Sequence, residues 1–350
     1  MTQDRPLRIL SIDGGGIRGL IPAVLLAKFE EKIREKDPDG SIADYFDLFA
    51  GTSTGGILVS GLLSPSINKY HKWNYNAYEL IDIYREWGPK IFANTFGHRV
   101  KSGFGLKSSK YPSKGLDDCL QAYFGNLSLS QLGKPCLIPS YDVERKKTHF
   151  FTRHDAREDF NQDFYLWDVI RSTTAAPTYF EASTIYSLGD FRNRQRYTMI
   201  DGGIYAHNPA LCAYAEARAN PYFRKITDEV SASNMILFSL GTGDTKSPYS
   251  PDQVKSWGLI KWARPLVGIM MGAAAEAIHY QLTQVFGSVE AKDQYQRIDP
   301  DLPDDVSPYM DDASPENIES LVRFAYQLAE SPEVEKKFNT VLNYIFETEE

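Results

Sequence analysis

The sequence predicts an α/β fold with three layers, in which helices cover both faces of a central, mostly parallel β-sheet and additional helices follow near the C-terminus. Short apolar runs that end in glycine-rich turns alternate with segments whose apolar residues recur at helical spacing, a pattern typical of strand–loop–helix units. Of the 350 residues, 42% are hydrophobic and 24% are charged, so the chain can bury the core that such a sheet requires.

The first strand–loop–helix unit lies at the start of the chain. Arg8–Ile12 is an apolar strand that leads into the loop Asp13–Gly19, and the helix that follows keeps its apolar period over Leu20–Ile33. The three successive glycines of this loop, Gly14–Gly16, allow backbone N–H groups to point into one cavity beside the N-terminus of the helix. The loop is therefore a candidate anion-binding site.

The same loop permits a second interpretation. Gly14, Gly16 and Gly19 fit the Gly-x-Gly-x-x-Gly fingerprint of dinucleotide-binding proteins. That fingerprint also requires an acidic residue at the end of the next strand, whereas the next strand, Tyr45–Ala50, leads into a turn that contains a serine. A nucleotide-binding module without hydrolase activity is thus one alternative to an enzyme.

The second motif is the turn Gly51-Thr52-Ser53-Thr54-Gly55, which lies between that strand and the apolar helical run Gly56–Leu63. In the Gly-x-Ser-x-Gly pattern a strained turn between strand and helix exposes a serine hydroxyl, so Ser53 is the candidate nucleophile. Acyl transfer also requires N–H donors for the oxygen that becomes negative, and the glycine loop can supply them. The alternative is a structural turn with no catalytic role.

Further helices and strands surround a segment of different character. Residues 88–115 have no clear period and carry many basic side chains, so we expect a long surface loop that serves as a lid or a regulatory segment. The other expected elements are the helices Tyr78–Trp87, Leu116–Phe124, Leu166–Ala176 and Asn208–Ala219 and the strands Lys134–Asp142, Thr148–Thr152, Tyr197–Ile200 and Asn234–Leu240.

The third motif is Asp201-Gly202-Gly203, at the end of an apolar strand. Asp201 is the candidate base for Ser53, because burial raises the pKa of a carboxyl and makes it a better proton acceptor. A Ser53–Asp201–His279 triad satisfies the usual chain order, but His279 lies inside an alanine-rich helix instead of a loop after a strand. His207, close to Asp201 in the sequence, is expected to be structural.

The C-terminal part of the chain is predicted to be mainly helical. Leu259–Phe286 keeps an apolar period and contains small residues that permit close helix packing; the alternative is a partner surface in a protein without catalytic activity. Ser314 and Ser331 each precede a proline and a glutamate, so each begins a closing helix. We therefore expect a catalytic domain of residues 1–245 and a helical region, residues 246–350, that packs on it.

Composition argues against several classes of function. The net charge of −8 argues against binding of a nucleic acid polymer. Cys119, Cys136 and Cys212 are too widely spaced for a zinc site, and no other ligand cluster appears, so no metal is expected. The sequence shows neither a secretory signal nor an apolar stretch long enough to cross a membrane, so we expect a cytoplasmic protein that acts at the inner face of the membrane.

Four blocks of the sequence together resemble the patatin-like phospholipases, in the order found in that family. They are Asp13-Gly14-Gly15-Gly16-Ile17-Arg18-Gly19, Gly51-Thr52-Ser53-Thr54-Gly55-Gly56, Arg171-Ser172-Thr173-Thr174-Ala175-Ala176-Pro177-Thr178-Tyr179-Phe180 and Asp201-Gly202-Gly203. The resemblance implies a lipid acyl hydrolase of the phospholipase A type, which acts on membrane phospholipids through a dyad of Ser53 and Asp201. It also implies an oxyanion hole made by the loop residues Gly14, Gly15, Gly16 and Arg18, and no cofactor for catalysis.

A narrower resemblance concerns the compact length and the added C-terminal helices. They are similar to those of bacterial patatin-like effectors that cyclic nucleotide second messengers activate in antiphage signalling. This resemblance implies a cyclic dinucleotide as activator, and a housekeeping lipase without an activator is the alternative. The sequence assigns no residue to nucleotide binding and does not predict the head group, the chain length or the ester position; a homo-oligomer is one expected assembly.

Overall fold

The computed structural model describes residues 5–66, 72–93, 109–189, 194–227, 229–244 and 249–346. Its centre is an eight-stranded sheet with the order β5-β6-β3-β2-β1-β7-β8, in which β4 pairs with β3 outside this path. The strands are β1 (Leu7–Ile12), β2 (Leu48–Gly51), β3 (Cys136–Asp142), β4 (Lys147–Thr152), β5 (Ser183–Tyr186), β6 (Arg196–Asp201), β7 (Met235–Leu240) and β8 (Tyr295–Ile298). The run from β3 through β2, β1 and β7 to β8 is parallel, and the other pairs are antiparallel.

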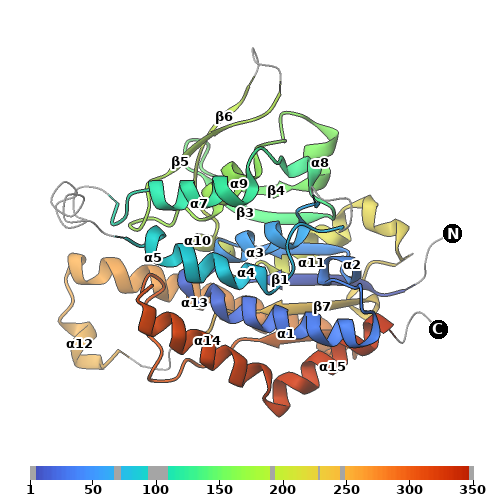
Figure 1. The fold of residues 1–350 in the computed structure, drawn as a ribbon. Coiled ribbons are helices and arrows are strands. Elements are labelled where there is room, and N and C mark those ends of the chain that lie inside the picture. The colour runs from blue at the N-terminus through green and yellow to red at the C-terminus, as the bar shows by residue number, and fades with distance from the viewer. Residues whose placement is uncertain are drawn as a thin grey trace.

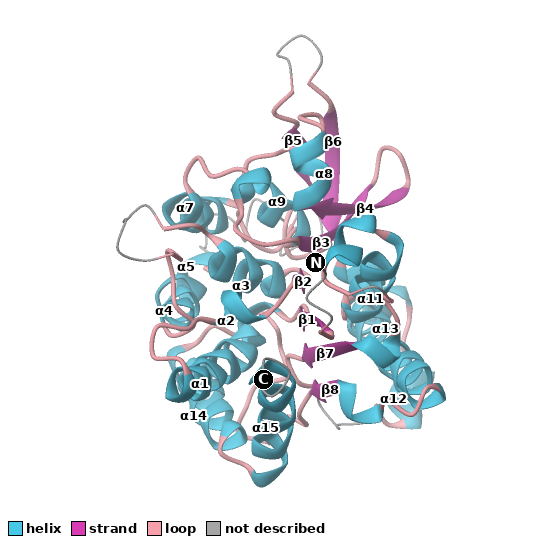
Figure 2. Cartoon of the chain, turned by 90° about the vertical axis from the view of Figure 1, so that its right-hand side faces the viewer, coloured by secondary structure: helices cyan, strands magenta, loops and turns pink. Residues whose placement is uncertain are grey.

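Helices cover both faces of this sheet, as Figures 1 and 2 show. One face carries α1 (Leu20–Lys36), α3 (Thr54–Leu63), α14 (Pro315–Ala329) and α15 (Pro332–Phe346), and the other carries α11 (Ala210–Ala219) and α13 (Leu259–Ser288). The remaining α-helices are α2 (Ile42–Tyr45), α4 (Glu79–Asp82), α5 (Gly88–Ile91), α7 (Lys114–Phe124), α8 (Arg153–Glu158), α9 (Leu166–Thr173), α10 (Gly203–Ala206) and α12 (Pro251–Lys255). The predicted three-layer α/β fold with a mostly parallel sheet is confirmed.

The alternation of side chains along β1 divides the interior into two cores. Leu10 and Ile12 pack into the core on the α1 side, whereas Leu7 and Ile9 pack into the core on the α11 side. Both faces of the strand are buried, which is why four of its six residues are apolar; the other two, Arg8 and Ser11, are buried polar residues. In the first core, the ring of Phe29 lies 5.2 Å from that of Phe238 and 5.3 Å from that of Phe338, so α1, β7 and α15 share one aromatic cluster.

Residues 249–346 are mainly helical, as predicted, but they also contribute a strand that the sequence did not predict. Strand β8 pairs in parallel with β7, so this stretch completes the central sheet as well as covering it. The two closing helices are confirmed, and the side chain of Ser314 caps α14 by accepting a hydrogen bond from the backbone N–H of Asn317. The boundary at residue 245 stays a prediction.

The packing expected for α13 is seen towards its C-terminus but not around Gly268. Ile278, Leu282 and Phe286 are buried in the core on the α11 side. Near the other end of the helix, a Cβ atom at Gly268 would meet no atom within 4 Å, and Met270 is exposed. Gly268 therefore lacks the close contact that the small residues predicted, although Met271, three residues further on, is buried.

Two local predictions are wrong. The segment Tyr45–Ala50 is not a strand throughout, because α2 ends at Tyr45 and β2 begins only at Leu48. The expected loop over residues 88–115 contains α5 and the start of α7, and α5 directly follows a π-helical turn over Ile83–Trp87. Residues 94–108 of this segment lie outside the described residues, so the lid or regulatory role stays a prediction.

Candidate active site

Ser53 lies in a strained turn between β2 and α3, as the Gly-x-Ser-x-Gly pattern predicts. Its backbone angles are φ 52° and ψ −117°, a conformation that side-chain-bearing residues rarely adopt and that costs about 1–3 kcal/mol. The turn also packs tightly against β1, because a Cβ atom at Gly55 would lie 2.2 Å from the carbonyl oxygen of Ile12. Only glycine fits there, which explains the last position of the pattern.

Two hydroxyl groups hold this turn in place. The side chain of Thr52 donates a hydrogen bond of 2.6 Å to the carbonyl oxygen of Ala206. The backbone N–H of Ser53 donates to the hydroxyl oxygen of Thr173 at 3.0 Å, and that hydroxyl donates to the carbonyl oxygen of Pro139 at 2.6 Å. The end of α9, in the third sequence block, therefore positions the serine turn.

Asp201 is the last residue of β6 and is buried beside Ser53. Its Oδ1 accepts a hydrogen bond of 2.7 Å from the backbone N–H of Gly203, and no described residue donates a well-formed hydrogen bond to Oδ2. Burial raises the pKa of Asp201 to about 7, against the opposing effects of the Gly203 N–H and, more weakly, the Ser53 hydroxyl. The carboxyl thus has the pKa of a base that works near neutral pH.

The glycine loop lies against the serine turn, because a Cβ atom at Gly14 would be 3.4 Å from Cβ of Ser53. The N–H of Gly14 donates to the carbonyl oxygen of His207, and the N–H of Arg18 donates to that of Gly15. Within the described chain, the N–H groups of Gly15 and Gly16 have no acceptor. Of the four residues expected in an oxyanion hole, the geometry thus favours Gly15 and Gly16 as the backbone donors.

A glycine is required at Gly16 for two reasons. Its φ is 60°, and a Cβ atom there would lie 2.1 Å from the carbonyl oxygen of Met310. The same carbonyl accepts a hydrogen bond of 2.9 Å from the N–H of Ile17. The segment between β8 and α14 therefore supports the far side of the glycine loop.

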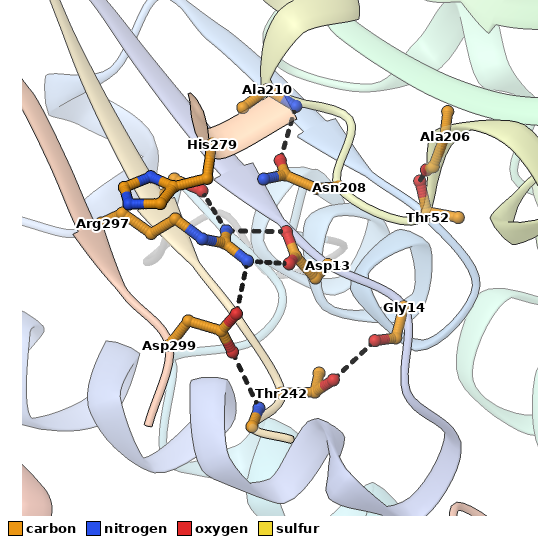
Figure 3. Close-up of polar contacts among 12 residues, drawn as sticks. Asp13, Gly14, Thr52, Ala206, Asn208, Ala210, Thr242, His279, Arg297 and Asp299 are labelled. Carbon is orange, nitrogen blue, oxygen red and sulfur yellow. Dashed lines mark hydrogen bonds and ion pairs between the residues drawn. The ribbon is translucent and has the colours of Figure 1, made fainter. Parts of the chain in front are cut away.

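A buried ion cluster under the glycine loop was not predicted from the sequence. Arg297, in β8, binds both carboxylate oxygens of Asp13 at 3.3 and 2.6 Å and one oxygen of Asp299 at 2.6 Å, as Figure 3 shows. Burial alone would lower the pKa of Arg297, but the two carboxylates raise it above its ordinary value. Thr242 adds a hydrogen bond of 2.6 Å from its hydroxyl to the carbonyl oxygen of Gly14. These contacts fix both ends of the Asp13–Gly14 peptide.

A cavity with apolar walls opens at the reactive groups and encloses about 670 Å³ of unfilled space, including its mouth. Gly15, Gly16, Ser53 and Asp201 all line it. The rest of its wall is mainly aliphatic and aromatic, and its large side chains are Ile17, Ile57, Ile83, Tyr84, Ile91, Phe92, Leu116, Tyr179, Phe180, Met271 and Met310. Such a cavity suits a hydrocarbon chain whose polar end lies at Ser53.

Neither candidate histidine forms a catalytic triad in this structure. The Nδ1 atom of His279 lies 3.1 Å from the hydroxyl of Tyr295, and Figure 3 shows its ring beside Arg297. His207 packs against the loop, with Nδ1 3.0 Å from where a Cβ of Gly14 would be. Burial, and to a smaller degree Arg18, lowers its pKa to about 3, so the ring is neutral. No described contact joins either ring to the carboxylate of Asp201.

Gly19, the last glycine of the dinucleotide-binding fingerprint, packs against neighbouring side chains of this chain. A Cβ atom at Gly19 would lie 2.1 Å from the hydroxyl of Thr54 and 2.7 Å from that of Tyr84, so this glycine serves internal packing. Across the described ranges, no group of three metal-binding side chains is present, and no helix combines the length and hydropathy needed to span a bilayer. The glycine loop faces the serine turn, as acyl transfer requires.

A mostly parallel sheet with a strained serine turn between a strand and a helix is a feature of α/β hydrolytic enzymes. The model of the patatin-like phospholipases matches residues 10–214. The chain is 33% identical to Patatin-like protein 2 of Arabidopsis thaliana, over 95% of this chain and 84% of that protein. It is 31% identical to Probable inactive patatin-3-Kuras 1 of Solanum tuberosum, over 93% of this chain and 87% of that protein.

The chain belongs to the patatin-like phospholipase family, a family of lipid acyl hydrolases. Among solved structures, it is similar to VipD from Legionella pneumophila at 12% identity, with a TM-score of 0.37 over 93% of this chain and 67% of that one. Because one relative is named inactive, family membership alone does not establish activity.

Proposed function

We propose that this protein hydrolyses acyl esters of membrane glycerophospholipids through a dyad of Ser53 and Asp201. One observation carries the proposal: a serine in a strained turn and a buried carboxyl with a pKa of about 7 line the same apolar cavity. Gly15 and Gly16, whose N–H groups have no acceptor among the described residues, line that cavity as well. Nucleophile, base, oxyanion donors and a site for an acyl chain are thus all supplied by this chain.

The first half-reaction forms an acyl-enzyme. The Ser53 hydroxyl oxygen attacks the ester carbonyl carbon while Asp201 takes the hydroxyl proton, and Gly15 and Gly16 stabilise the negative oxygen. When the tetrahedral intermediate collapses, the bond to the glycerol oxygen breaks and Asp201 returns the proton to that oxygen. A lysophospholipid leaves, and the acyl group stays on Ser53.

The second half-reaction releases the fatty acid. Water attacks the acyl carbonyl carbon and gives a proton to Asp201, and the same N–H donors stabilise the oxyanion. Breakage of the acyl–oxygen bond then returns that proton to Ser53. Oδ1 of Asp201 is already occupied by the Gly203 N–H, so Oδ2 is the oxygen that carries the proton in both steps.

Fatty acid release from phospholipid vesicles tests the proposal. Ser53→Ala is expected to lower release by at least about 10³-fold, because the covalent step needs the hydroxyl. In the parent, a fluorophosphonate probe is expected to label Ser53 and to block release. A Ser53→Ala protein that retains normal turnover would refute the assignment.

The expected activation by a cyclic dinucleotide in antiphage defence stays a prediction, as does action at the inner face of the membrane. The same assay tests the activator when a panel of cyclic oligonucleotides is added. Release that needs one member of the panel supports a gated effector. Equal release with and without the panel supports a constitutive lipase.

A further inference from the structure

Tyr249, just before α12, and three residues of the N-terminal half of α13 carry apolar side chains into solvent. Leu266 and Ile269 are exposed, and Met270 is 51% exposed. In Figure 1, α12 and the start of α13 extend away from the sheet on the side where α5 also lies. This surface includes Gly268, where a Cβ atom would meet no atom within 4 Å.

Aromatic and basic side chains gather on the same segment. The ring of Trp257 lies edge-on to Tyr249 at 4.9 Å and to Trp262 at 5.0 Å. Lys255 and Lys261 are exposed nearby in the sequence. Tryptophan and tyrosine rings with neighbouring lysines are typical of segments that rest at the boundary between water and lipid, where an apolar ring meets polar head groups.

Residues of this exposed surface are followed directly in the chain by residues of the cavity wall. Met271, the residue after exposed Met270, lines the cavity and would lie 2.8 Å from a Cβ atom at Gly203. The same arrangement recurs at the segment before α14, where Tyr309 is 63% exposed and the next residue, Met310, lines the cavity. Two separate segments thus pass directly from exposed apolar side chains to the cavity wall.

We propose that the side chains of Tyr249, Trp257, Leu266, Ile269, Met270 and Tyr309 form a docking face that rests on the surface of a phospholipid bilayer. This inference rests on the proposed function, because it supplies the route by which a membrane lipid reaches Ser53. An acyl chain that leaves the bilayer beside Met270 or Tyr309 meets Met271 or Met310 next and stays in apolar surroundings. A second copy of the chain bound to this face would block the route of the lipid to the cavity. We therefore assign the bilayer as the partner of this face.

Vesicle binding by an inactive protein tests the docking face separately from catalysis. In a Ser53→Ala background, the triple change Leu266→Ser, Ile269→Ser and Met270→Ser is expected to weaken co-sedimentation with phosphatidylcholine–phosphatidylglycerol vesicles by at least about tenfold. A matched triple alters exposed apolar residues that do not line the cavity: Phe160→Ser, Tyr280→Ser and Val289→Ser. This control is expected to bind vesicles as the Ser53→Ala protein does.

Hydrolysis of p-nitrophenyl butyrate, a monomeric ester in solution, reports on the active site alone. With Ser53 present, both triples are expected to turn it over within about twofold of the parent, because none of the six positions lines the cavity. Equal vesicle binding by the two triples, or no vesicle binding by the Ser53→Ala protein, would overturn the docking face. So would a dimeric parent that the first triple converts to a monomer without change in vesicle binding. Absence of ester hydrolysis, with vesicle binding still lost in the first triple, would refute the hydrolase and leave the docking face standing.

Discussion

Replacement of Asp201 by asparagine is expected to make the protein more stable at pH 8 while it abolishes hydrolysis. The carboxyl is buried, and burial raises its pKa from 3.8 to about 7. Because the folded state binds this proton more tightly than the unfolded state, the carboxyl favours folding below pH 4, and that advantage is lost as the pH rises through about 7. Above pH 7 the folded protein therefore holds a buried charge without a cationic partner among the described residues.

The size of the effect follows from the shift in pKa. A difference of about three units corresponds to about 4 kcal/mol, which is the most that Asp201→Asn can recover at pH 8. The asparagine Oδ1 can still accept the hydrogen bond from the Gly203 N–H, so the substitution need not break that contact. At pH 5 the folded carboxyl is protonated but the unfolded one is still largely ionised, so the gain is expected to shrink to about 1.7 kcal/mol, roughly two fifths of its value at pH 8.

Denaturant unfolding at pH 5, 6, 7 and 8 measures this difference for the parent and for Asp201→Asn. Ser53→Ala is the matched control, because it also removes activity but leaves the buried carboxyl in place. Since the Ser53 hydroxyl lowers the pKa of Asp201 only weakly, the stability difference of this variant from the parent is expected to change much less with pH than that of Asp201→Asn. A stability difference between Asp201→Asn and the parent that is equal at pH 5 and pH 8 would show that Asp201 is not desolvated. Lower stability of Asp201→Asn at pH 8 would refute the reasoning as well.

Three further predictions concern the same site. The kcat/KM of the parent for a soluble ester is expected to fall about tenfold per pH unit below pH 7 and to level off above pH 7, because Asp201 must be ionised to act as the base. A midpoint near pH 4 in this profile would contradict the prediction. Thr173→Val removes the acceptor for the Ser53 N–H and the donor to the Pro139 carbonyl oxygen. We therefore expect the protein to lose about 1–3 kcal/mol of stability and to show a lower kcat with little change in KM. An unchanged kcat would show that the serine turn keeps its shape without Thr173. Arg297→Gln leaves the buried carboxylate of Asp13 and the partly exposed carboxylate of Asp299 without their cation. It is expected to cost about 3–5 kcal/mol in denaturant unfolding, part of which Asp13→Asn should restore in the double variant; additive losses would show that Arg297 and Asp13 are not coupled.

The sequence predicted those parts of the fold and the site that depend on local patterns. The apolar run of β1, the period of α1 and the glycine-rich turns each reflect the environment of neighbouring residues, so their positions were predicted closely. The turn around Ser53 could be located for the same reason, because a strained strand-to-helix turn needs small residues at fixed places. Whether Ser53 and Asp201 act as a dyad stays a prediction, although the structure brings both to one cavity.

The parts that were missed depend on contacts between distant segments. Strand β8 is short and reads Tyr-Gln-Arg-Ile, and its polar residues gave no strand signal. Arg297 is buried there only because Asp13, Ser239 and Asp299 surround its guanidinium group. A single buried arginine in a polar stretch has no local pattern that distinguishes it from a surface residue, so one sequence could not reveal it.

Arg297 changes how the C-terminal region should be understood. The family model ends at residue 214, and the sequence suggested that residues 246–350 pack on a finished catalytic domain. Yet β8 completes the sheet beside β7, its arginine binds the aspartate that begins the glycine loop, and Met310 accepts the hydrogen bond from Ile17 at the other end of that loop. A buried carboxylate such as Asp13 is costly without its cation, so the loop conformation that leaves the Gly15 and Gly16 N–H groups unpaired depends on this region. The proposed oxyanion donors are therefore encoded near residue 15 but held in place by residues near 300.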